Sequence, residues 1–122
     1  FKITDLADKV DKLANDGVAR KRLLATLIRC DLLILDEMAL QLQISSTFRN
    51  FLFTLLTQRY ERNSTIFTTN REFDQWGALF NDNVEAIAII ERIIHKSVVF
   101  NIKGESFRIK EQLELQRRYR RG

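Results

Sequence analysis

Leu32-Leu33-Ile34-Leu35-Asp36-Glu37 joins four consecutive aliphatic residues to two carboxylates. A continuous apolar run is typical of a parallel strand buried on both faces, because a half-exposed strand alternates apolar and polar residues. In open α/β sheets, ligands bind beyond the carboxyl ends of the strands. The sequence therefore predicts a buried strand over residues 31–36, with Asp36 and Glu37 at a ligand-binding edge.

An acid pair at such an edge can serve phosphoryl transfer, where one carboxylate holds Mg²⁺ and another group orients the attacking water. The usual companion is a phosphate-binding loop that reads G-x-x-x-x-G-K-[ST]. The glycines here are Gly17, Gly77, Gly104 and Gly122, and none is followed by lysine. The acids can equally well cap the turn after the strand, so the pair alone leaves both interpretations open.

Length and composition limit the class of protein. The chain has 122 residues, 45% hydrophobic and 30% charged, which fits one small folded domain or a piece of a larger one. It begins at Phe1 rather than at methionine, so we expect a truncated or excised product. No apolar stretch approaches the ~20 residues of a membrane span, and the single cysteine, Cys30, suits a reducing cytoplasm.

Basic residues gather in two places. The net charge is +4, with one cluster at Arg20-Lys21-Arg22 and a second in a basic tail over residues 110–122. The tail cluster consists of Arg117, Arg118, Arg120 and Arg121. Such clusters can neutralise the phosphates of nucleic acid. They also improve solubility and suit the C-terminal end of a helix, so DNA contact by the tail is one of two open interpretations.

Helical and β-branched patterns alternate along the chain, and no Pro/Gly/Ser linker interrupts them. Helices are expected from a Thr4 cap to Asn15-Asp16-Gly17, over 18–29, from Ser45 or Ser46 to Arg59, over 73–80 and over 84–95. Further strands are expected at 65–69, ending at Asn70, and at 97–102. This alternation predicts an α/β fold with a parallel sheet and right-handed crossovers.

Three further polar residues are candidates for the site. Asn70 ends the strand after the acids, so parallel pairing would place its amide beside Asp36 and Glu37, although it can also be a turn residue. Arg92 lies late in an otherwise apolar helix, and Arg108 follows a tight turn. Either arginine can stabilise the charge of a transferring phosphoryl group, and either can be a structural ion-pair partner.

Taken together, these blocks resemble the C-terminal two-thirds of the ATPase domain of IstB-like proteins. These are AAA+ helper ATPases of bacterial insertion sequences, related to the DnaC/DnaI helicase loaders. The resemblance rests on Asp31 to Glu37, Arg59-Tyr60-Glu61-Arg62, Thr68-Thr69-Asn70 with Phe73 to Gly77, Glu91 to His95, and Asn101 to Arg108. The last block, with Lys103-Gly104-Glu105, is most specific to the IstB side. The chain departs from the family after the acids, where Met38-Ala39-Leu40-Gln41-Leu42 replaces a Gly-Tyr-Leu-Pro-like turn.

The resemblance implies a fold. Residues 1–122 would form one partial AAA+ P-loop NTPase domain, from the Walker B acids to the C-terminus. Its core would be a three-layer α/β/α arrangement around a mostly parallel sheet. The Walker A strand would be missing from between the strand ending at Asn70 and the strand at 97–102. Because that loss leaves unpaired strand edges, we expect the chain to close the gap, exchange an element or associate with another chain.

The resemblance also implies roles for the residues. Asp36 would coordinate Mg²⁺ and ATP, Glu37 would activate water, and Asn70 would occupy the sensor-1 position. Arg92 would be an arginine finger that reaches a neighbouring subunit's nucleotide, and Arg108 a second arginine near the nucleotide. Without the phosphate loop, we expect the isolated chain to be inactive and not to bind ATP tightly.

Partners follow from the same resemblance. The parent protein would be a bacterial, cytoplasmic ATPase that assembles on double-stranded DNA and delivers the target to a transposase. A helicase loader that serves a replicative helicase is the alternative with the same fold. A non-catalytic, truncated module for DNA binding or assembly is the alternative from a different class.

Overall fold

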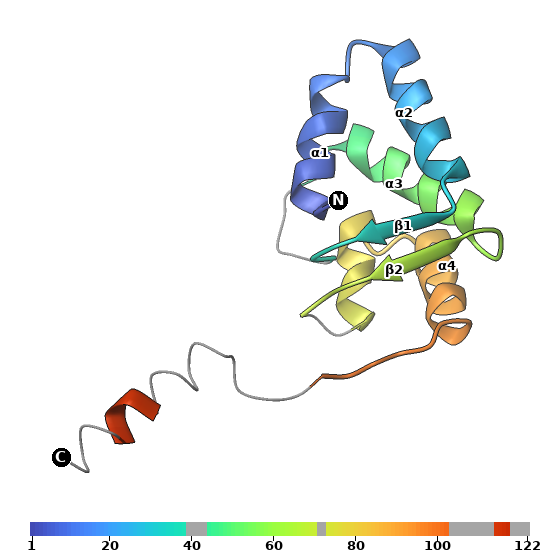
Figure 1. Cartoon of the computed structure of the whole chain (residues 1–122). Coiled ribbons are helices and arrows are strands. Elements are labelled where there is room, and N and C mark those ends of the chain that lie inside the picture. The colour runs from blue at the N-terminus through green and yellow to red at the C-terminus, as the bar shows by residue number, and fades with distance from the viewer. Residues whose placement is uncertain (39–43, 71–72, 103–113, 118–122) are drawn as a thin grey trace.

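The computed structural model describes residues 1–38, 44–70, 73–102 and 114–117. Its helices and strands occur in the order α1 (Ile3–Lys12), α2 (Gly17–Arg29), β1 (Leu32–Leu35), α3 (Ser46–Arg59), β2 (Ser64–Phe67), η1 (Phe73–Phe80) and α4 (Val84–His95). Figure 1 shows the two strands side by side. The result is a mixed helix/strand fold with a small parallel sheet.

The sheet is built around β1. Strands β1 and β2 pair in parallel, with Ile34 opposite Ile66 and Leu35 opposite Phe67. The other edge of β1 is paired with the start of the chain, where Lys2 and Asp36 form a parallel bridge. Both edges of β1 are therefore occupied, and the acids that follow it lie at an internal position of the sheet.

Helices α2, α3 and α4 lie close to their predicted ranges. Ser45 caps α3 by accepting the backbone N–H of Phe48 at 3.0 Å, and Asn83 caps α4 in the same way. The start of α1 was predicted wrongly, because Thr4 lies inside that helix and Lys2 precedes it without a side-chain cap. The N–H of Ile3 instead donates to the carbonyl of Asp36 at 2.9 Å, so the chain turns into α1 directly as it leaves the sheet.

The turn between the first two helices also differs from the prediction. Helix α1 ends at Lys12, before Asn15-Asp16-Gly17. Asp16 instead begins the next helix, since its side chain accepts the N–H of Ala19 at 3.0 Å. An aspartate is among the preferred residues at this position because its carboxylate satisfies an unpaired N–H of the first turn.

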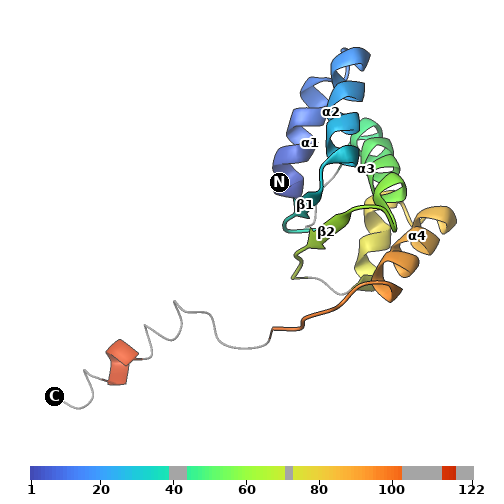
Figure 2. The same ribbon diagram turned by 45° about the vertical axis from the view of Figure 1, so that its right-hand side comes forward.

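Only one face of the sheet is covered by described helices, so the predicted burial of both faces is wrong. Leu33 and Leu35 are buried in a core shared with the helices. On the opposite face, the exposed fraction is 53% for Leu32, 45% for Ile34 and 47% for Ile66. Figure 2 shows the helices on one side of the strands. The described residues therefore form two layers rather than the predicted three, because nothing described packs over these side chains.

The predicted strand at 97–102 is not a strand. These residues leave the end of α4 as an extended trace beneath β2 (Figure 1) and pair with no other described segment. Strand β2 is likewise shorter than predicted, since it ends at Phe67 rather than at Asn70. A strand exists only through its hydrogen-bonded neighbour, and the described sheet contains two strands, β1 and β2.

Candidate functional site: an acid pair fixed by a threonine

The acid pair lies where β1 leaves the sheet. The N–H of Asp36 donates to the carbonyl of Phe1 at 2.7 Å, which continues the pairing of β1 with the start of the chain. Asp36 is half-buried and Glu37 is exposed. The sequence placed both acids correctly at the carboxyl end of the strand.

One hydroxyl group connects the two acids. The Thr68 hydroxyl group donates a hydrogen bond to Oδ1 of Asp36. The hydroxyl oxygen of Thr68 also accepts the backbone N–H of Glu37 at 2.9 Å. Sequence reasoning did not identify Thr68. The available signal was its register, because Leu35 pairs with Phe67 and the next residue on each strand is therefore Asp36 and Thr68.

Glu37 has an unusual backbone conformation. Its φ angle is +60°, a region that costs a residue with a Cβ roughly 1–2 kcal/mol. The next residue is held firmly, since the N–H of Met38 donates to the carbonyl of Thr68 at 2.8 Å and Met38 is fully buried. The Thr69 hydroxyl also donates to the carbonyl of Met38 at 2.8 Å. Strain that the surroundings hold in place in this way occurs frequently at functional sites.

The two carboxylates are oxygen ligands of the kind that a divalent cation takes. An ionised carboxylate offers about four acceptor positions, and the hydrogen bond from Thr68 occupies one of them, on Oδ1 of Asp36. Mg²⁺ in phosphate-binding sites takes one or two carboxylates and fills its other positions with water and phosphate oxygens. Asp36 and the exposed Glu37 therefore fit Mg²⁺ held jointly with a phosphate ligand.

Asn70 lies beyond Thr68 and Thr69 at the same end of the sheet, and it is exposed. Its predicted position beside Asp36 and Glu37 stays a prediction. The closest contacts with the acids come instead from Thr68, two residues earlier.

Arg92 lies away from the acids of its own chain. It is exposed on α4, one turn before Lys96, whose N–H donates to its carbonyl at 3.1 Å. The ammonium group of Lys96 is 3.5 Å from the Glu61 carboxylate, which precedes β2, whereas the acids lie beyond the other end of that strand. Arg92 and the acid pair of the same chain therefore do not form one site.

The structure describes one of the remaining predicted arginines. Arg117 is exposed in the described segment 114–117. Four other predicted arginines lie outside the described residues: Arg108, Arg118, Arg120 and Arg121.

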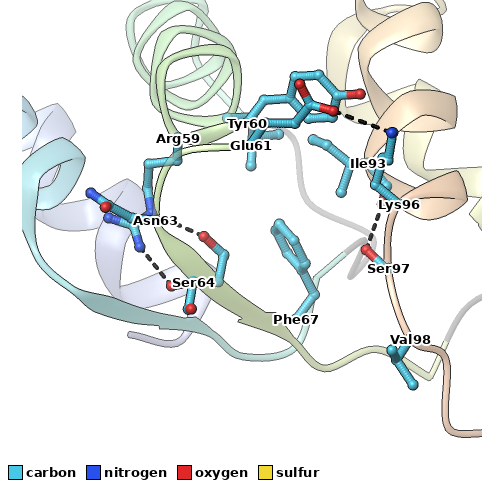
Figure 3. A pocket seen from close by; sticks show the side chains of 12 residues that line it. Arg59, Tyr60, Glu61, Asn63, Ser64, Phe67, Ile93, Lys96, Ser97 and Val98 are labelled. Carbon is cyan, nitrogen blue, oxygen red and sulfur yellow. Dashed lines mark hydrogen bonds and ion pairs between the residues drawn. The ribbon is translucent and has the colours of Figure 1, made fainter.

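A groove of about 780 Å³ lies between β2 and the end of α4. Its walls include Tyr60, Phe67 and Val98 (Figure 3). The acids are not among its lining residues. This groove is therefore a separate feature from the acid site.

The groove is bordered by a buried arginine. The side chain of Arg59 is 3% exposed, and its guanidinium donates to the carbonyls of Leu27 at 2.8 Å, Cys30 at 2.7 Å and Ser64 at 2.6 Å. It thus joins the end of α2, the end of α3 and the start of β2. Sequence reasoning placed Arg59 at the end of a helix and in a family block but did not predict its burial, although Arg59 continues the spacing of the buried residues Leu52 and Leu55.

Comparison with known proteins identifies the family. The profile of IstB-like ATP binding proteins matches residues 1–115. The chain belongs to the IstB-like ATP-binding proteins. The predicted family is thereby confirmed.

Individual relatives agree with the family assignment. The chain is 34% identical over 108 residues to the insertion sequence IS5376 putative ATP-binding protein of Geobacillus stearothermophilus, covering 88% of this chain and 42% of the relative. It is 44% identical over 92 residues to the insertion sequence IS21 putative ATP-binding protein of Pseudomonas aeruginosa, covering 75% of this chain and 34% of the relative. The IstB-like chain thus spans less than half the length of these curated relatives.

Among the described residues of this IstB-like chain, no helix combines the length and apolar character needed to cross a bilayer.

Proposed function

We propose that this chain carries the acid-bearing part of an ATP-hydrolysing site in a transposition helper of an insertion sequence. The observation that carries the proposal is the Asp36–Glu37 pair at the end of β1, held by Thr68 with Glu37 at φ +60°. The relatives' names add that they are ATP-binding proteins of insertion sequences.

The two acids take different roles. Asp36 holds Mg²⁺, which screens the charge of the phosphate oxygens when it is bound. Glu37 accepts a hydrogen bond from the attacking water and polarises it, as its exposed carboxylate permits. Asn70, at the same sheet edge, orients this water or contacts the terminal phosphate. Thr68 lets the two acids take different roles, because it fixes the side chain of Asp36 and the backbone of Glu37.

The arginines complete the site from elsewhere. Arg92 is exposed on α4 and distant from its own acids, which supports a role at the nucleotide of a neighbouring subunit. Arg108 is assigned the second arginine position on the family resemblance alone. An arginine supplied by a partner subunit makes hydrolysis depend on assembly, because its guanidinium stabilises the charge of the transferred phosphoryl group.

No glycine of the 122 residues is followed by lysine, so a test of the acid pair takes its phosphate-binding loop from a relative. A direct test therefore grafts residues 1–115 into the aligned position of the Pseudomonas aeruginosa relative. In this chimera, Asp36→Asn is expected to weaken Mg²⁺-dependent binding of a fluorescent ATP analogue about tenfold or more. The control Glu85→Gln changes an exposed acid in the first turn of α4 and should leave binding unchanged. Equal affinities for all three proteins would contradict the proposal.

The basic tail is proposed to contact duplex DNA. Arg117 is exposed, and the tail cluster also contains Arg118, Arg120 and Arg121. If all four arginines contact phosphates, changing them to alanine should reduce the slope of log K against log salt by about 3–4, since each contact contributes ~0.9. The slope is measured by fluorescence anisotropy on a DNA duplex. Binding that does not respond to salt would rule out the tail as the contact.

Two alternatives remain open to test. A helicase loader would bind a replicative helicase, but the Lys103–Arg108 block and the insertion-sequence relatives favour the transposition helper. A non-catalytic assembly module would leave the chimera unable to bind ATP with or without Asp36. The binding experiment therefore separates this second alternative from the proposed function.

A further inference from the structure

The Asp36 carboxylate is held at one of its two oxygens. The Thr68 hydroxyl donates to Oδ1, and the hydroxyl oxygen accepts the backbone N–H of Glu37 at 2.9 Å. A threonine hydroxyl has one proton to donate, so the bond to Asp36 commits that proton. Rotation of the Thr68 side chain would break both hydrogen bonds, which keeps the hydroxyl directed at Oδ1.

The main chain fixes both partners of this hydrogen bond. The N–H of Asp36 donates to the carbonyl of Phe1 at 2.7 Å, and its carbonyl accepts the N–H of Ile3 at 2.9 Å. On the neighbouring strand, the N–H of Thr68 donates to the carbonyl of Leu35 at 3.1 Å. The carboxylate and the hydroxyl therefore face each other from two paired segments, and their contact exists before a ligand binds.

The two oxygens of Asp36 are consequently unequal ligands for a cation. Oδ1 shares its electron density with the hydroxyl proton of Thr68, which makes Oδ2 the stronger ligand. A cation that took both oxygens would compete with this hydrogen bond, and hydrogen bonds to an ionised carboxylate are among the strong ones. The arrangement thus favours a cation that needs one oxygen of Asp36.

Magnesium and calcium ions differ in this requirement. Ca²⁺ takes about 6–8 oxygen ligands in flexible geometry and accepts carboxylates through one or both oxygens. Mg²⁺ requires a nearly regular octahedron and fills most of it with water and phosphate oxygens. A carboxylate restricted to one oxygen therefore deprives Ca²⁺ of a ligand and leaves the coordination of Mg²⁺ complete.

We propose that Thr68 makes the acid site selective for Mg²⁺ over Ca²⁺, because it restricts Asp36 to one metal-binding oxygen. This inference rests on the proposed function, since it concerns the metal that Asp36 holds beside the nucleotide. Thr68 is a positioning residue, and its effect on the metal passes through the Asp36 carboxylate.

The test uses the chimera described above and the fluorescent ATP analogue, titrated separately with Mg²⁺ and with Ca²⁺. The readout is the ratio of the two midpoint concentrations relative to the unmodified chimera, and it requires no hydrolysis. In Thr68→Val, this ratio should shift toward Ca²⁺ by about fivefold or more, because Asp36 gains a second oxygen for the larger ion. Thr68→Ala removes the same hydroxyl and should shift the ratio in the same direction, whereas Thr68→Ser should restore it.

The matched control is Thr69→Val. Thr69 follows Thr68, and its hydroxyl donates to the carbonyl of Met38 at 2.8 Å. The control therefore removes a hydroxyl that holds the same turn and leaves the bond between Thr68 and Asp36 in place. Any loss of affinity in Thr69→Val should be equal for the two metals, so its ratio should match that of the unmodified chimera.

The outcomes distinguish this inference from the proposed function. An unchanged ratio in Thr68→Val overturns the inference, even where both affinities fall, because Thr68 would then have only a structural role. An equal shift of the ratio in Thr69→Val overturns it as well. If Asp36→Asn leaves the metal dependence of binding unchanged, the proposed function itself fails, and the inference fails with it.

Discussion

At the scale of single residues, one hydroxyl sets the geometry of the acid pair. Thr68 donates to the Asp36 carboxylate and accepts the N–H of Glu37. The neighbouring bonds between Met38 and the Thr68–Thr69 segment hold the backbone on the far side. The left-handed backbone conformation of Glu37 is thereby fixed before any ligand arrives.

Replacing Thr68 with valine tests this role, because valine keeps the branched shape and removes the hydroxyl. We expect the free energy of unfolding to fall by about 1 kcal/mol, the typical net value of such hydrogen bonds. Thr68→Ser should restore most of it. Thr57→Val, at an exposed position of α3, is the control. Urea denaturation measures all four proteins, and a Thr68→Val protein as stable as the Thr57→Val protein would contradict the assignment.

The acids themselves were predictable from the sequence, whereas the threonine that fixes them, Thr68, was not. An apolar run followed by Asp36 and Glu37 is a local pattern that can be read along the chain. Thr68 acts through its position opposite Asp36, and that position depends on the register of two strands distant in sequence. Arg92 illustrates the same limit, because its separation from the acids depends on how α4 packs.

At the scale of elements, helices were easier to predict than strands. Helix α4 follows the 84–95 pattern and α3 begins after its Ser45 cap, because caps and helical spacing are local. The segment 97–102 has strand composition but no partner, and is not a strand. The apolar run of β1 was taken to mean burial on both faces, yet Leu32 and Ile34 are about half exposed, since burial depends on which elements lie above the sheet.

Arg59 joins three of these elements and provides a prediction at this scale. Its guanidinium satisfies carbonyls at the end of α2, where unpaired carbonyls carry partial negative charge. Arg59→Met should lower the free energy of unfolding by about 2–4 kcal/mol, because buried acceptors lose their partner. Arg59→Lys should recover little, since an ammonium group cannot reproduce the planar fork of donors.

The control for Arg59 is Arg62→Met. Arg62 is exposed, and its guanidinium donates a long hydrogen bond of 3.5 Å to the side chain of Gln58. Thermal and urea unfolding of the two variants should therefore differ clearly. Equal stability of Arg59→Met and Arg62→Met would show that the buried network does not hold α2 to β2.

At the scale of the whole molecule, the described structure is an incompletely covered sheet. Helices pack on the Leu33 and Leu35 face, while Ile34 and Ile66 remain exposed on the other (Figure 2). The chain spans less than half of its relatives, so the activity of a whole IstB-like protein is a proposal for this chain. In the proposed function, Arg92 acts at the nucleotide of a neighbouring subunit, so a second copy completes the acid site.

The rate of ATP hydrolysis by the chimera tests the central claim most directly, through Glu37→Gln. Because this substitution keeps the side-chain size and removes the base, we predict a rate reduced by about 10²–10⁴-fold, with affinity for the ATP analogue retained. The Glu85→Gln chimera should hydrolyse ATP like the unmodified one. A Glu37→Gln chimera that hydrolyses ATP at the unmodified rate would contradict the assignment of the acid pair as the hydrolytic site.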